Sequence, residues 1–394
     1  MRIGVMLRHY DQHGGGVRVY THRILRAMLD AKIPHEFVFL YKNPSLVGTY
    51  AADPKVTEAV LPGKNLLWWD QVEVPRAIDR YGIDVLYNPK YSLPLHAPCP
   101  SAWVCHGLDW YVMPWASRRI DRLSHKFLVP RYARRADAII AVSEITREHV
   151  MEFLPIPAER VFTVYSGVDD SFRTKASPEA RASLERRYQL PPRFFLYSGA
   201  IYPPKNFTRL VQAYAQVGPA AGISLVIAGG ENRFLSAHEL KVPEQLGLNS
   251  WVKWLGWVDP KELPALYQRA EVLLLPSLFE SYGLPIVEAM ACGTAVLTSN
   301  RFGTLEIAGN AALLVDPESV EDIAAGMRRL AGEPQLRARL IAAGTERVRD
   351  LTWTRCAEQT IQVLENIAAH PRRRYRGSTG TRRPLPAMSL ESDS

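Results

Sequence analysis

Several features are scarce in this sequence of 394 residues, and each scarcity excludes some classes of protein. Its four cysteines, Cys99, Cys105, Cys292 and Cys356, form no C-x-x-C pair and no Cys/His cluster with metal-ligand spacing. We therefore expect buried free thiols in a reducing compartment, and no metal site. No apolar run approaches the length of a membrane span, and charges interrupt the start, MRIGVMLRHYDQ, which indicates a first strand rather than a signal peptide. We expect a cytoplasmic protein, at most peripheral on the inner face of a membrane.

Two motifs of nucleotide-binding proteins are also missing. No Asp-x-Asp occurs, the carboxylate spacing with which many transferases hold Mg²⁺ against a diphosphate. The run His13-Gly14-Gly15-Gly16 does not follow G-x-G-x-x-G, so a dinucleotide fingerprint is not supported. If the protein releases a diphosphate, its own amines and amides must stabilise that leaving group. No cofactor is implied.

The charge balance is mildly basic, with a net charge of +8 and a pI near 9.3. Residues 371–394 form a basic tail, in which six arginines stand among Gly, Ser, Thr and Pro. This tail is either a disordered, solvated segment or one that binds an anionic lipid surface. Without the tail the net charge falls to +4, which is too mild to indicate a nucleic-acid partner.

The length and the pattern of the chain predict two α/β domains. Each half alternates short apolar or β-branched runs with helical patterns, which is typical of a parallel sheet with crossover helices. The polar stretch 171–192 ends in two prolines and places the junction there. We expect strands at residues 3–7, 37–40, 85–87, 103–106, 138–142 and 161–164, and then at 194–198, 225–228, 252–255, 295–298 and 313–315.

The most informative stretch is PSLFESYGLPIVEAMACGTAVLTS, residues 276–299. Pro285 suits the first position of a helix, which places Glu280 in the preceding loop and Glu288 in the first turn. Open amides and the helix dipole make such a start attractive to anions. A phosphate flanked by two carboxylates that accept hydrogen bonds from hydroxyls describes a nucleotide-sugar site. Solvated acids at a helix start explain the spacing equally simply.

This stretch resembles the signature of the retaining glycosyltransferases of family four, the glycosyl transferases group 1, which reads PS-x-x-E-x-[FY]-G-L-P-x-x-E-A-M-A-C-G. The resemblance extends from about Gly15 to His370. It implies the GT-B fold, in which two Rossmann-like parallel-sheet domains face each other across a cleft. It also implies an acceptor-binding domain of residues 1–185, a nucleotide-sugar domain of residues 193–352, and a helix, 353–370, that crosses back onto the first domain.

The resemblance gives roles to the signature residues. Glu280 would bind hydroxyls of the donor sugar, and Glu288 would accept hydrogen bonds from the ribose. Backbone amides of the loop would face the sugar or the diphosphate. We therefore expect the donor-binding loop to comprise Ser281, Tyr282, Gly283 and Leu284.

Loops in the first half contribute further candidates. Gly15 and Gly16 stand at a strand-to-helix turn, where glycine lets a ligand approach the backbone, although a flexible turn would also place them there. In the family such a loop faces the cleft. His106 ends an apolar strand, and a histidine there points toward the ligand crevice of a parallel sheet unless it is structural. The family often has His-Asp here, with the histidine beside the transferred sugar. This chain has Gly107 next, so Asp109 is not assigned a role.

Loops in the second half supply the remaining candidates. Lys205 precedes a helix that we expect Asn206 to cap, and a cation there is unfavourable unless it pairs with an anion or lies exposed at the surface. In the family a basic pair in the loop that begins at Gly199 binds the diphosphate, which makes Gly199 and Lys205 donor-binding candidates, but Ala200 replaces the first member of the pair. Arg209 or Arg301 would compensate. A third loop, Trp257 and Val258, would lie near the base, although core packing explains these two residues equally well.

We thus expect a hexosyltransferase with His106, Glu280 and Lys205 as catalytic residues. The first-half strings WWDQVEVPRAI and DVLYNPKYSLPL resemble bacterial envelope transferases, which favours GDP-mannose as donor, with UDP-glucose as the close rival. The acceptor would be a glycan, a lipid-linked sugar or a small molecule. The alternatives are another GT-B enzyme, such as an epimerase or a phosphorylase, and a non-catalytic basic scaffold that binds membranes or polymers.

Overall fold

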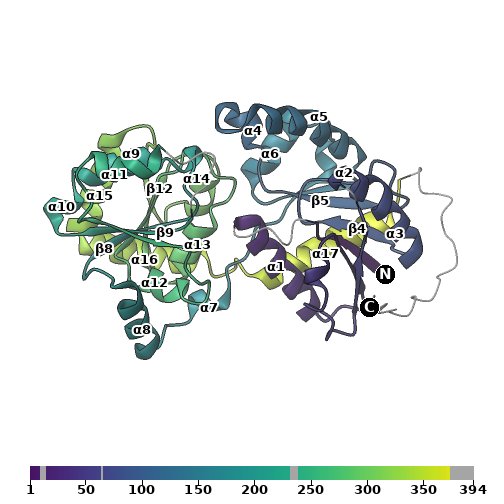
Figure 1. The fold of residues 1–394 in the computed structure, drawn as a ribbon, viewed down its shortest axis with the longest axis horizontal. Helices are drawn as coiled ribbons and strands as arrows, with labels where there is room; N and C mark the ends of the chain where they lie inside the picture. Colours follow the sequence, from purple (N-terminus) through teal and green to yellow (C-terminus); the bar gives the residue numbers. More distant parts are fainter. Residues whose placement is uncertain (9–14, 64, 231–237, 373–394) are drawn as a thin grey trace, which may run out of the picture.

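The computed structural model describes residues 1–8, 15–63, 65–230 and 238–372. Within these ranges the chain forms two lobes side by side, each built around one parallel sheet (Figure 1). The first lobe contains β1 to β7 and the second contains β8 to β13. This arrangement confirms the predicted α/β class and the GT-B architecture. The sequence also predicts a helix near Leu235, which, like most of the basic tail, lies outside the described residues.

The first sheet has seven strands in the order β3-β2-β1-β4-β5-β6-β7. The chain builds outward from β1 in one direction and then, from β4, in the other. The carboxyl ends of β1 and β4 therefore flank a switch point, where open α/β sheets bind their ligands. The strands are Arg2–Met6 (β1), Glu36–Tyr41 (β2), Val56–Val60 (β3), Val85–Asn88 (β4), Ser101–Cys105 (β5), Ala138–Ala141 (β6) and Val161–Thr163 (β7).

The second sheet has six strands in the order β10-β9-β8-β11-β12-β13. Its switch point lies between β8 and β11, so the loops that follow these two strands lie next to each other. The strands are Phe194–Ser198 (β8), Ser224–Ala228 (β9), Val252–Gly256 (β10), Val272–Leu275 (β11), Ala295–Ser299 (β12) and Leu313–Val315 (β13).

Helices cover both faces of both sheets (Figure 1). None of the helices in the described ranges combines the length and the apolar character needed to cross a bilayer. The helices are Gly16–Asp30 (α1), Leu66–Trp68 (α2), Val74–Tyr81 (α3), Asp109–Val112 (α4), Arg119–Arg135 (α5), Glu144–Phe153 (α6), Asp170–Arg173 (α7), Pro178–Tyr188 (α8), Phe207–Ala215 (α9), Gly218–Ala221 (α10), Val242–Gln245 (α11), Leu263–Arg269 (α12), Leu284–Ala291 (α13), Phe302–Ala308 (α14), Val320–Gly332 (α15), Pro334–Arg347 (α16) and Trp353–Ala369 (α17).

The prediction missed two strands, β3 and β11. β3 reads VTEAV, and its central residue is a buried acid, Glu58. The carboxylate can be buried because it accepts hydrogen bonds from the Tyr41 hydroxyl at 2.9 Å and from the Gly48 amide at 2.7 Å. β11 is a short, fully buried apolar run directly after α12, and periodicity does not separate such a run from a helix segment. The cysteines are free thiols, as predicted, and three of the four are fully buried.

The last helix, α17, returns from the second lobe to the first. It packs against α1 and against β4, β5 and β6 of the first sheet. The Trp353 ring lies edge-on to Tyr20 at a centroid distance of 5.6 Å, and Glu365 accepts from His35 at 2.8 Å. α8 packs against α12 of the second lobe. The division into residues 1–185 and 193–352 remains our proposal, and the packing of α8 favours moving its first boundary to a position before Pro178.

The lobes are joined where α17 begins. Val168 donates its amide to the Leu351 carbonyl at 3.0 Å and forms a parallel bridge with Thr352. A Cβ added at Gly167 would lie 2.2 Å from the backbone nitrogen of Trp353. The two backbones therefore approach so closely that only glycine fits at residue 167.

We expect Gly167→Ala to destabilise the protein by about 1–3 kcal/mol, because the new methyl group would collide with backbone atoms that cannot turn aside. Thermal unfolding should show this as a lower Tm. Gly332→Ala is the matched control, since nothing lies within 4 Å of its Cβ position near the end of α15. A Tm for Gly167→Ala equal to that of the control would contradict the tight joint.

Candidate functional site

The candidate site begins at the start of α13. Gly283 precedes the helix with a φ of 96°, a left-handed conformation that glycine adopts without strain. Pro285 stands in the first turn, as predicted, and Glu280 lies in the preceding loop. The helix starts one residue earlier than predicted, at Leu284, so Glu288 is its fifth residue and the first turn contains no acid.

A buried ion pair connects the loops after β8 and β11. The Lys205 amine donates to Oε1 of Glu280, and Ser277 Oγ donates to the same oxygen at 3.0 Å. The two charged side chains are only 10% and 11% exposed. Burial alone would lower the pKa of Lys205, but Glu280 and Tyr202 outweigh it and raise that pKa. Two residues assigned to different parts of the donor are therefore in direct contact before any donor is bound.

The rest of the loop after β8 differs in detail from the prediction. Gly199 has a φ of 139°. Its carbonyl oxygen lies so close to Gly229 that a Cβ added at Gly229 would be only 1.8 Å from it. Asn206 precedes α9, but it makes no side-chain cap and adopts a left-handed conformation. Its amide instead donates to the carbonyls of Pro276 at 2.9 Å and Pro317 at 2.6 Å. The capping prediction was therefore wrong, and Asn206 ties the loops around Lys205 together.

The two arginines suggested as substitutes for a basic residue at position 200 both have other partners. Arg209 donates to the Asn206 side chain at 3.1 Å. Arg301 pairs with Asp316 at 2.8 Å and with Glu318 at 2.6 Å. Arg301 is thus already neutralised by two carboxylates, which disfavours it as a diphosphate ligand.

Glu288 lies one turn into α13. The Tyr267 hydroxyl donates to its Oε2 at 3.0 Å. Burial raises the pKa of Glu288 to about 7, despite this hydrogen bond and the positive charge of Arg23 on α1. Arg23 also pairs with Asp169 at 2.5 Å. A carboxyl in such a setting changes its charge near neutral pH.

The first lobe contributes His106, which directly follows β5. Its Nε2 lies 2.7 Å from the Pro89 carbonyl, which only accepts hydrogen bonds, so Nε2 carries the proton and Nδ1 is left as an acceptor. Burial lowers the pKa of His106 to about 4, with a smaller contribution from Lys90. The imidazole is therefore neutral at physiological pH. Partial burial also lowers the pKa of Lys90 to about 8, and sequence reasoning missed this half-buried amine.

Predicted residues from opposite lobes meet at two places. A Cβ at Gly107 would lie 1.9 Å from Ser281 Oγ, so the loop after β5 touches the loop before α13. A Cβ at Gly16 would lie 3.6 Å from a methyl carbon of Leu284. The starts of α1 and α13 are therefore neighbours across the junction. Gly15 precedes α1 with a φ of 89°, while His13 and Gly14 lie outside the described residues.

The same loop before α13 also binds the two lobes together. The Ser281 carbonyl accepts from Ser143 Oγ at 2.6 Å, and the Tyr282 hydroxyl donates to the Ser166 carbonyl. Ser143 also caps α6 by accepting from the Thr146 amide at 3.1 Å. Two residues of this loop, Ser281 and Tyr282, are thus engaged with the first lobe.

Glu306 on α14 is a contact that sequence reasoning missed. Its carboxylate accepts from the amides of Glu144 at 2.8 Å and Ile145 at 2.9 Å, at the start of α6 in the other lobe. A carboxylate at a helix start satisfies open amides and the positive end of the helix dipole. Beside it, Phe279 and Phe302 pack against Met113 and Ala116. Together these contacts hold the lobes close together.

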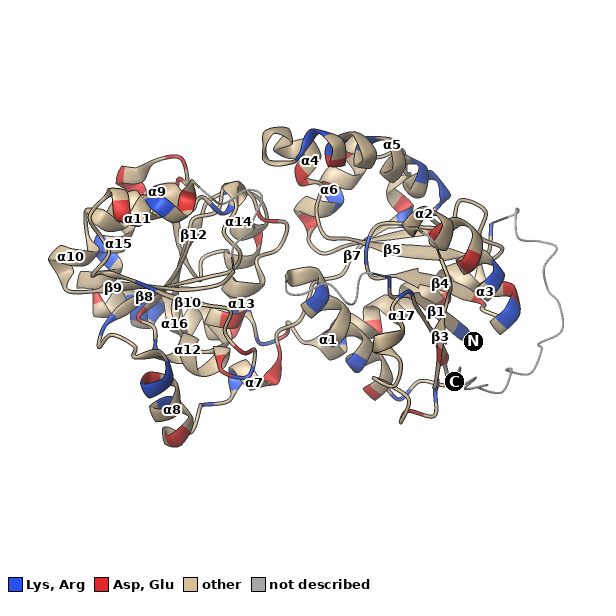
Figure 2. Cartoon of the chain, viewed as in Figure 1, with Lys and Arg blue, Asp and Glu red and all other residues tan. Residues whose placement is uncertain are grey.

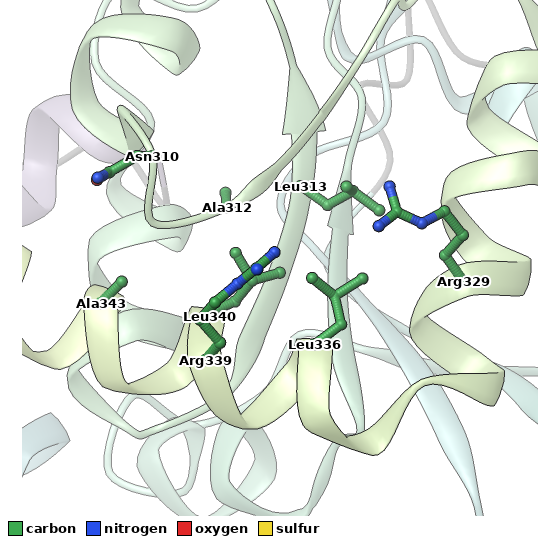
Figure 3. Close-up of a pocket in the computed structure, with 8 residues that line it drawn as sticks. All are labelled: Asn310, Ala312, Leu313, Arg329, Leu336, Arg339, Leu340 and Ala343. Atoms are coloured by element: carbon green, nitrogen blue, oxygen red, sulfur yellow. The ribbon is translucent and has the colours of Figure 1, made fainter.

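Two predicted base-contacting residues differ in exposure. The Trp257 side chain is 68% exposed, whereas Val258 is buried in the core. Elsewhere a hollow of about 440 Å³ lies over β13 between α15 and α16 (Figure 3). Figure 3 shows Arg329 reaching from α15 toward Leu313, opposite Leu336 and Leu340. None of the predicted site residues lines it, so it is separate from the candidate site.

Known families match both lobes. Residues 14–172 match the family model Glycosyltransferase Family 4, and residues 183–347 match Glycosyl transferases group 1. The O-antigen chain mannosyltransferase B of Escherichia coli is 30% identical over 58% of this chain and 61% of its own length. The serotype-specific mannosyltransferase WbdA of the same species is 32% identical over 71% of this chain and 36% of its own length. The chain thus spans less than two thirds of either relative.

Solved structures share the fold over nearly the whole chain. A sucrose-phosphate synthase from Thermosynechococcus elongatus has a TM-score of 0.76 at 21% identity and covers 94% of this chain and 99% of its own. The Anabaena protein HepE, solved in complex with UDP and glucose, has a TM-score of 0.74 at 18% identity and covers 93% of this chain and 100% of its own.

We expect a pH-dependent stability that comes from Glu288. Its folded pKa of about 7 lies above the ordinary value of 4.5, so the folded state holds this proton more tightly than the unfolded state. The free energy of unfolding should therefore fall as pH rises between these values, by on the order of 2–3 kcal/mol. Glu288→Gln should remove this decline, so its Tm relative to wild type should rise from pH 5 to pH 8.

The control for this measurement is Glu346→Gln, because Glu346 is 65% exposed on α16. Its Tm should follow that of the wild type at every pH. A Glu288→Gln variant whose Tm difference from wild type is the same at pH 5 and pH 8 would show that Glu288 titrates normally.

Proposed function

We propose, from the premise that the chain belongs to the group 1 glycosyl transferases of family four, that it transfers a hexose from a nucleoside-diphosphate sugar to a hydroxyl of an acceptor. The observation that carries the proposal is the Lys205–Glu280 pair beside the start of α13. It places an amine, a carboxylate and the amino end of a helix together at the switch point of the second sheet. The neutral imidazole of His106 belongs to the facing lobe.

Each group has a proposed role that its chemistry supports. Lys205 and the amides at the start of α13 stabilise the charge that develops on the departing diphosphate. Glu280 accepts hydrogen bonds from sugar hydroxyls, and Glu288 accepts from the ribose. His106 lies at the first-lobe wall, where its Nδ1 can accept a hydrogen bond from the sugar or the acceptor.

The transfer itself is proposed to retain the configuration of the sugar. The bond from the anomeric carbon to the diphosphate oxygen breaks, and a bond to the acceptor oxygen forms on the same face. The acceptor proton passes to the departing diphosphate oxygen, so no enzyme base is required. The site residues then act by positioning and by electrostatics, which depend on excluding water from the closed cleft.

Donor binding must change the Lys205–Glu280 pair. The amine has three protons to donate, so it can turn one toward a phosphate oxygen while the carboxylate turns toward hydroxyls. Each charge then exchanges one buried partner for another, and neither is left unpaired. A preformed pair therefore keeps both side chains in place until the donor arrives.

We further propose GDP-mannose as the donor, with UDP-glucose second. Two relatives are named as mannosyltransferases, which favours the first, and one structural neighbour was solved with UDP and glucose. A glycan, a lipid-linked sugar or a small molecule would accept the hexose. A cytoplasmic location with contact to the inner membrane face is part of this proposal, and the part of the basic tail after Arg372 lies outside the described residues.

Nucleotide binding is the first test of the proposal. GDP-mannose should raise the Tm by several degrees, because a ligand at a hundred times its Kd adds about 2.7 kcal/mol to the stability of the folded state. GDP, UDP and UDP-glucose form the comparison panel in thermal-shift measurements. A panel in which no nucleotide changes the Tm would overturn the proposed function, while a preference for UDP-glucose would overturn only the choice of donor.

Substitution of the buried pair is the second test. Lys205→Met and Glu280→Gln should each reduce transfer by about a hundredfold to a thousandfold, because each removes a group that acts on the reacting donor. Each single variant should also lose stability, since it leaves a buried charge unpaired. Steady-state transfer rates and Tm are measured together.

The double variant Lys205→Met/Glu280→Gln separates catalysis from folding. It removes both charges at once, so its Tm should lie above that of at least one single variant. Its transfer rate should remain as low as that of the single variants. A double variant with wild-type transfer would show that the pair is only structural.

A further inference from the structure

An exposed apolar strip lies on the first lobe and contains none of the candidate site residues. Large apolar side chains stand out into solvent at Trp115, Ile120, Leu123 and Phe127, with exposed fractions of 63%, 75%, 67% and 57%. Trp115 belongs to the short turn before α5, and the other three lie on α5 itself. We call these four residues the α5 strip. Isolated exposed apolar residues are ordinary on protein surfaces, but a contiguous group indicates an interaction.

The spacing on α5 places its three members on one side of the helix. Ile120, Leu123 and Phe127 are separated by three and four residues, which is the repeat of a single helix face. The opposite side of α5 is already used, because Val129, Tyr132 and Ala133 are buried in the lobe core. A helix that only covers its own sheet needs one apolar face, and α5 has two.

Positive charge surrounds the α5 strip. Arg131 and Arg134 continue the same spacing along the helix, and Arg119 and Lys126 flank it. Figure 2 shows several Lys and Arg positions in blue along α5. The Arg131 guanidinium also lies 3.4 Å from the centre of the Phe127 ring. Asp121 is the one carboxylate on α5. Viewed along the helix axis, it projects at about a right angle to Ile120 and away from Leu123 and Phe127.

We propose that the α5 strip is a docking surface for an anionic lipid bilayer. Trp, Phe, Leu and Ile side chains enter the boundary between headgroups and acyl chains, while arginine and lysine contact the lipid phosphates. The combination of apolar residues with a basic border fits this partner better than it fits a protein surface of mixed charge. This docking is independent of the basic tail, and it does not rest on the proposed transfer reaction.

The position of α5 relates the docked surface to the candidate site. His125 on α5 binds the Tyr91 hydroxyl at 2.8 Å and packs on Trp110 at a ring distance of 4.4 Å. Tyr91 follows β4, and Trp110 follows β5 by way of His106 and Gly107. The α5 strip is therefore attached to the segments after β4 and β5, which carry Lys90 and His106 on the first-lobe side of the candidate site. An acceptor anchored in the bilayer would approach the candidate site from this side.

Vesicle co-sedimentation tests the proposal with the full-length protein. The wild type should bind vesicles of phosphatidylcholine mixed with phosphatidylglycerol, bind pure phosphatidylcholine weakly, and release as salt is raised. Leu123→Ser/Phe127→Ser and Arg131→Glu/Arg134→Glu should each weaken binding to the mixed vesicles by at least about tenfold. All four positions are on the α5 strip or its basic border, outside the candidate catalytic machinery, so the affinity for GDP-mannose should not change.

Three controls make the result decisive. Leu246→Ser and Arg186→Glu alter an exposed leucine and an exposed arginine on the second lobe and should leave vesicle binding unchanged. Arg382→Glu/Arg383→Glu alters the basic tail instead of α5. Equal Tm values show that the variants fold.

The proposal is overturned if the α5 variants bind vesicles as the wild type does, or if only the tail variant loses binding. It is also overturned if wild type without vesicles forms a dimer that the α5 variants dissociate, because the strip would then be covered by a second copy. Light scattering after gel filtration measures the molecular mass and so shows whether the protein is a monomer or a dimer.

Discussion

The close approach of the loop before α13 to the first lobe is the constraint on which the site depends. Ser281 and Leu284 each lie against a glycine of the other lobe, Gly107 and Gly16. A larger residue at Gly107 would hold the lobes apart and admit water, because its Cβ would lie 1.9 Å from Ser281 Oγ. The same loop carries Glu280, so the geometry that closes the junction also fixes the carboxylate that pairs with Lys205. The closure of the lobe junction and the preorganisation of the Lys205–Glu280 pair therefore have one structural origin.

Sheet topology explains why residues far apart in the sequence meet. β8 and β11 are adjacent at the point where the strand order reverses, so the loops that carry Lys205 and Glu280 must be neighbours. In the first sheet, β1, β4 and β5 are adjacent in the same way, which gathers Gly15, Lys90 and His106 at one edge. The same topological rule therefore gathers the candidate site residues of each lobe at one edge of its sheet.

Much of this arrangement was predictable from the sequence, and the failures have physical causes. The alternation of apolar runs and helices predicted the architecture, and the signature stretch led to Glu280, Gly283 and the helix after them. Asn206 was predicted as a cap from its residue type, but tertiary contacts with Pro276 and Pro317 took its side chain. Glu306 had no local signal at all, because its partners at the start of α6 lie 161 and 162 residues away.

The contact of Glu306 with α6 is one of several that join the lobes, alongside those made by Ser281 and Tyr282. A carboxylate at a helix start contributes about 0.3–1 kcal/mol when partly exposed, and water replaces it easily once the lobes separate. A free energy of 1.4 kcal/mol corresponds to a tenfold ratio of closed to open forms, so the Glu306 contact by itself would not keep the two lobes together. The closed arrangement of the lobes therefore depends on the sum of these contacts, and the share that Glu306 contributes would weaken in concentrated salt.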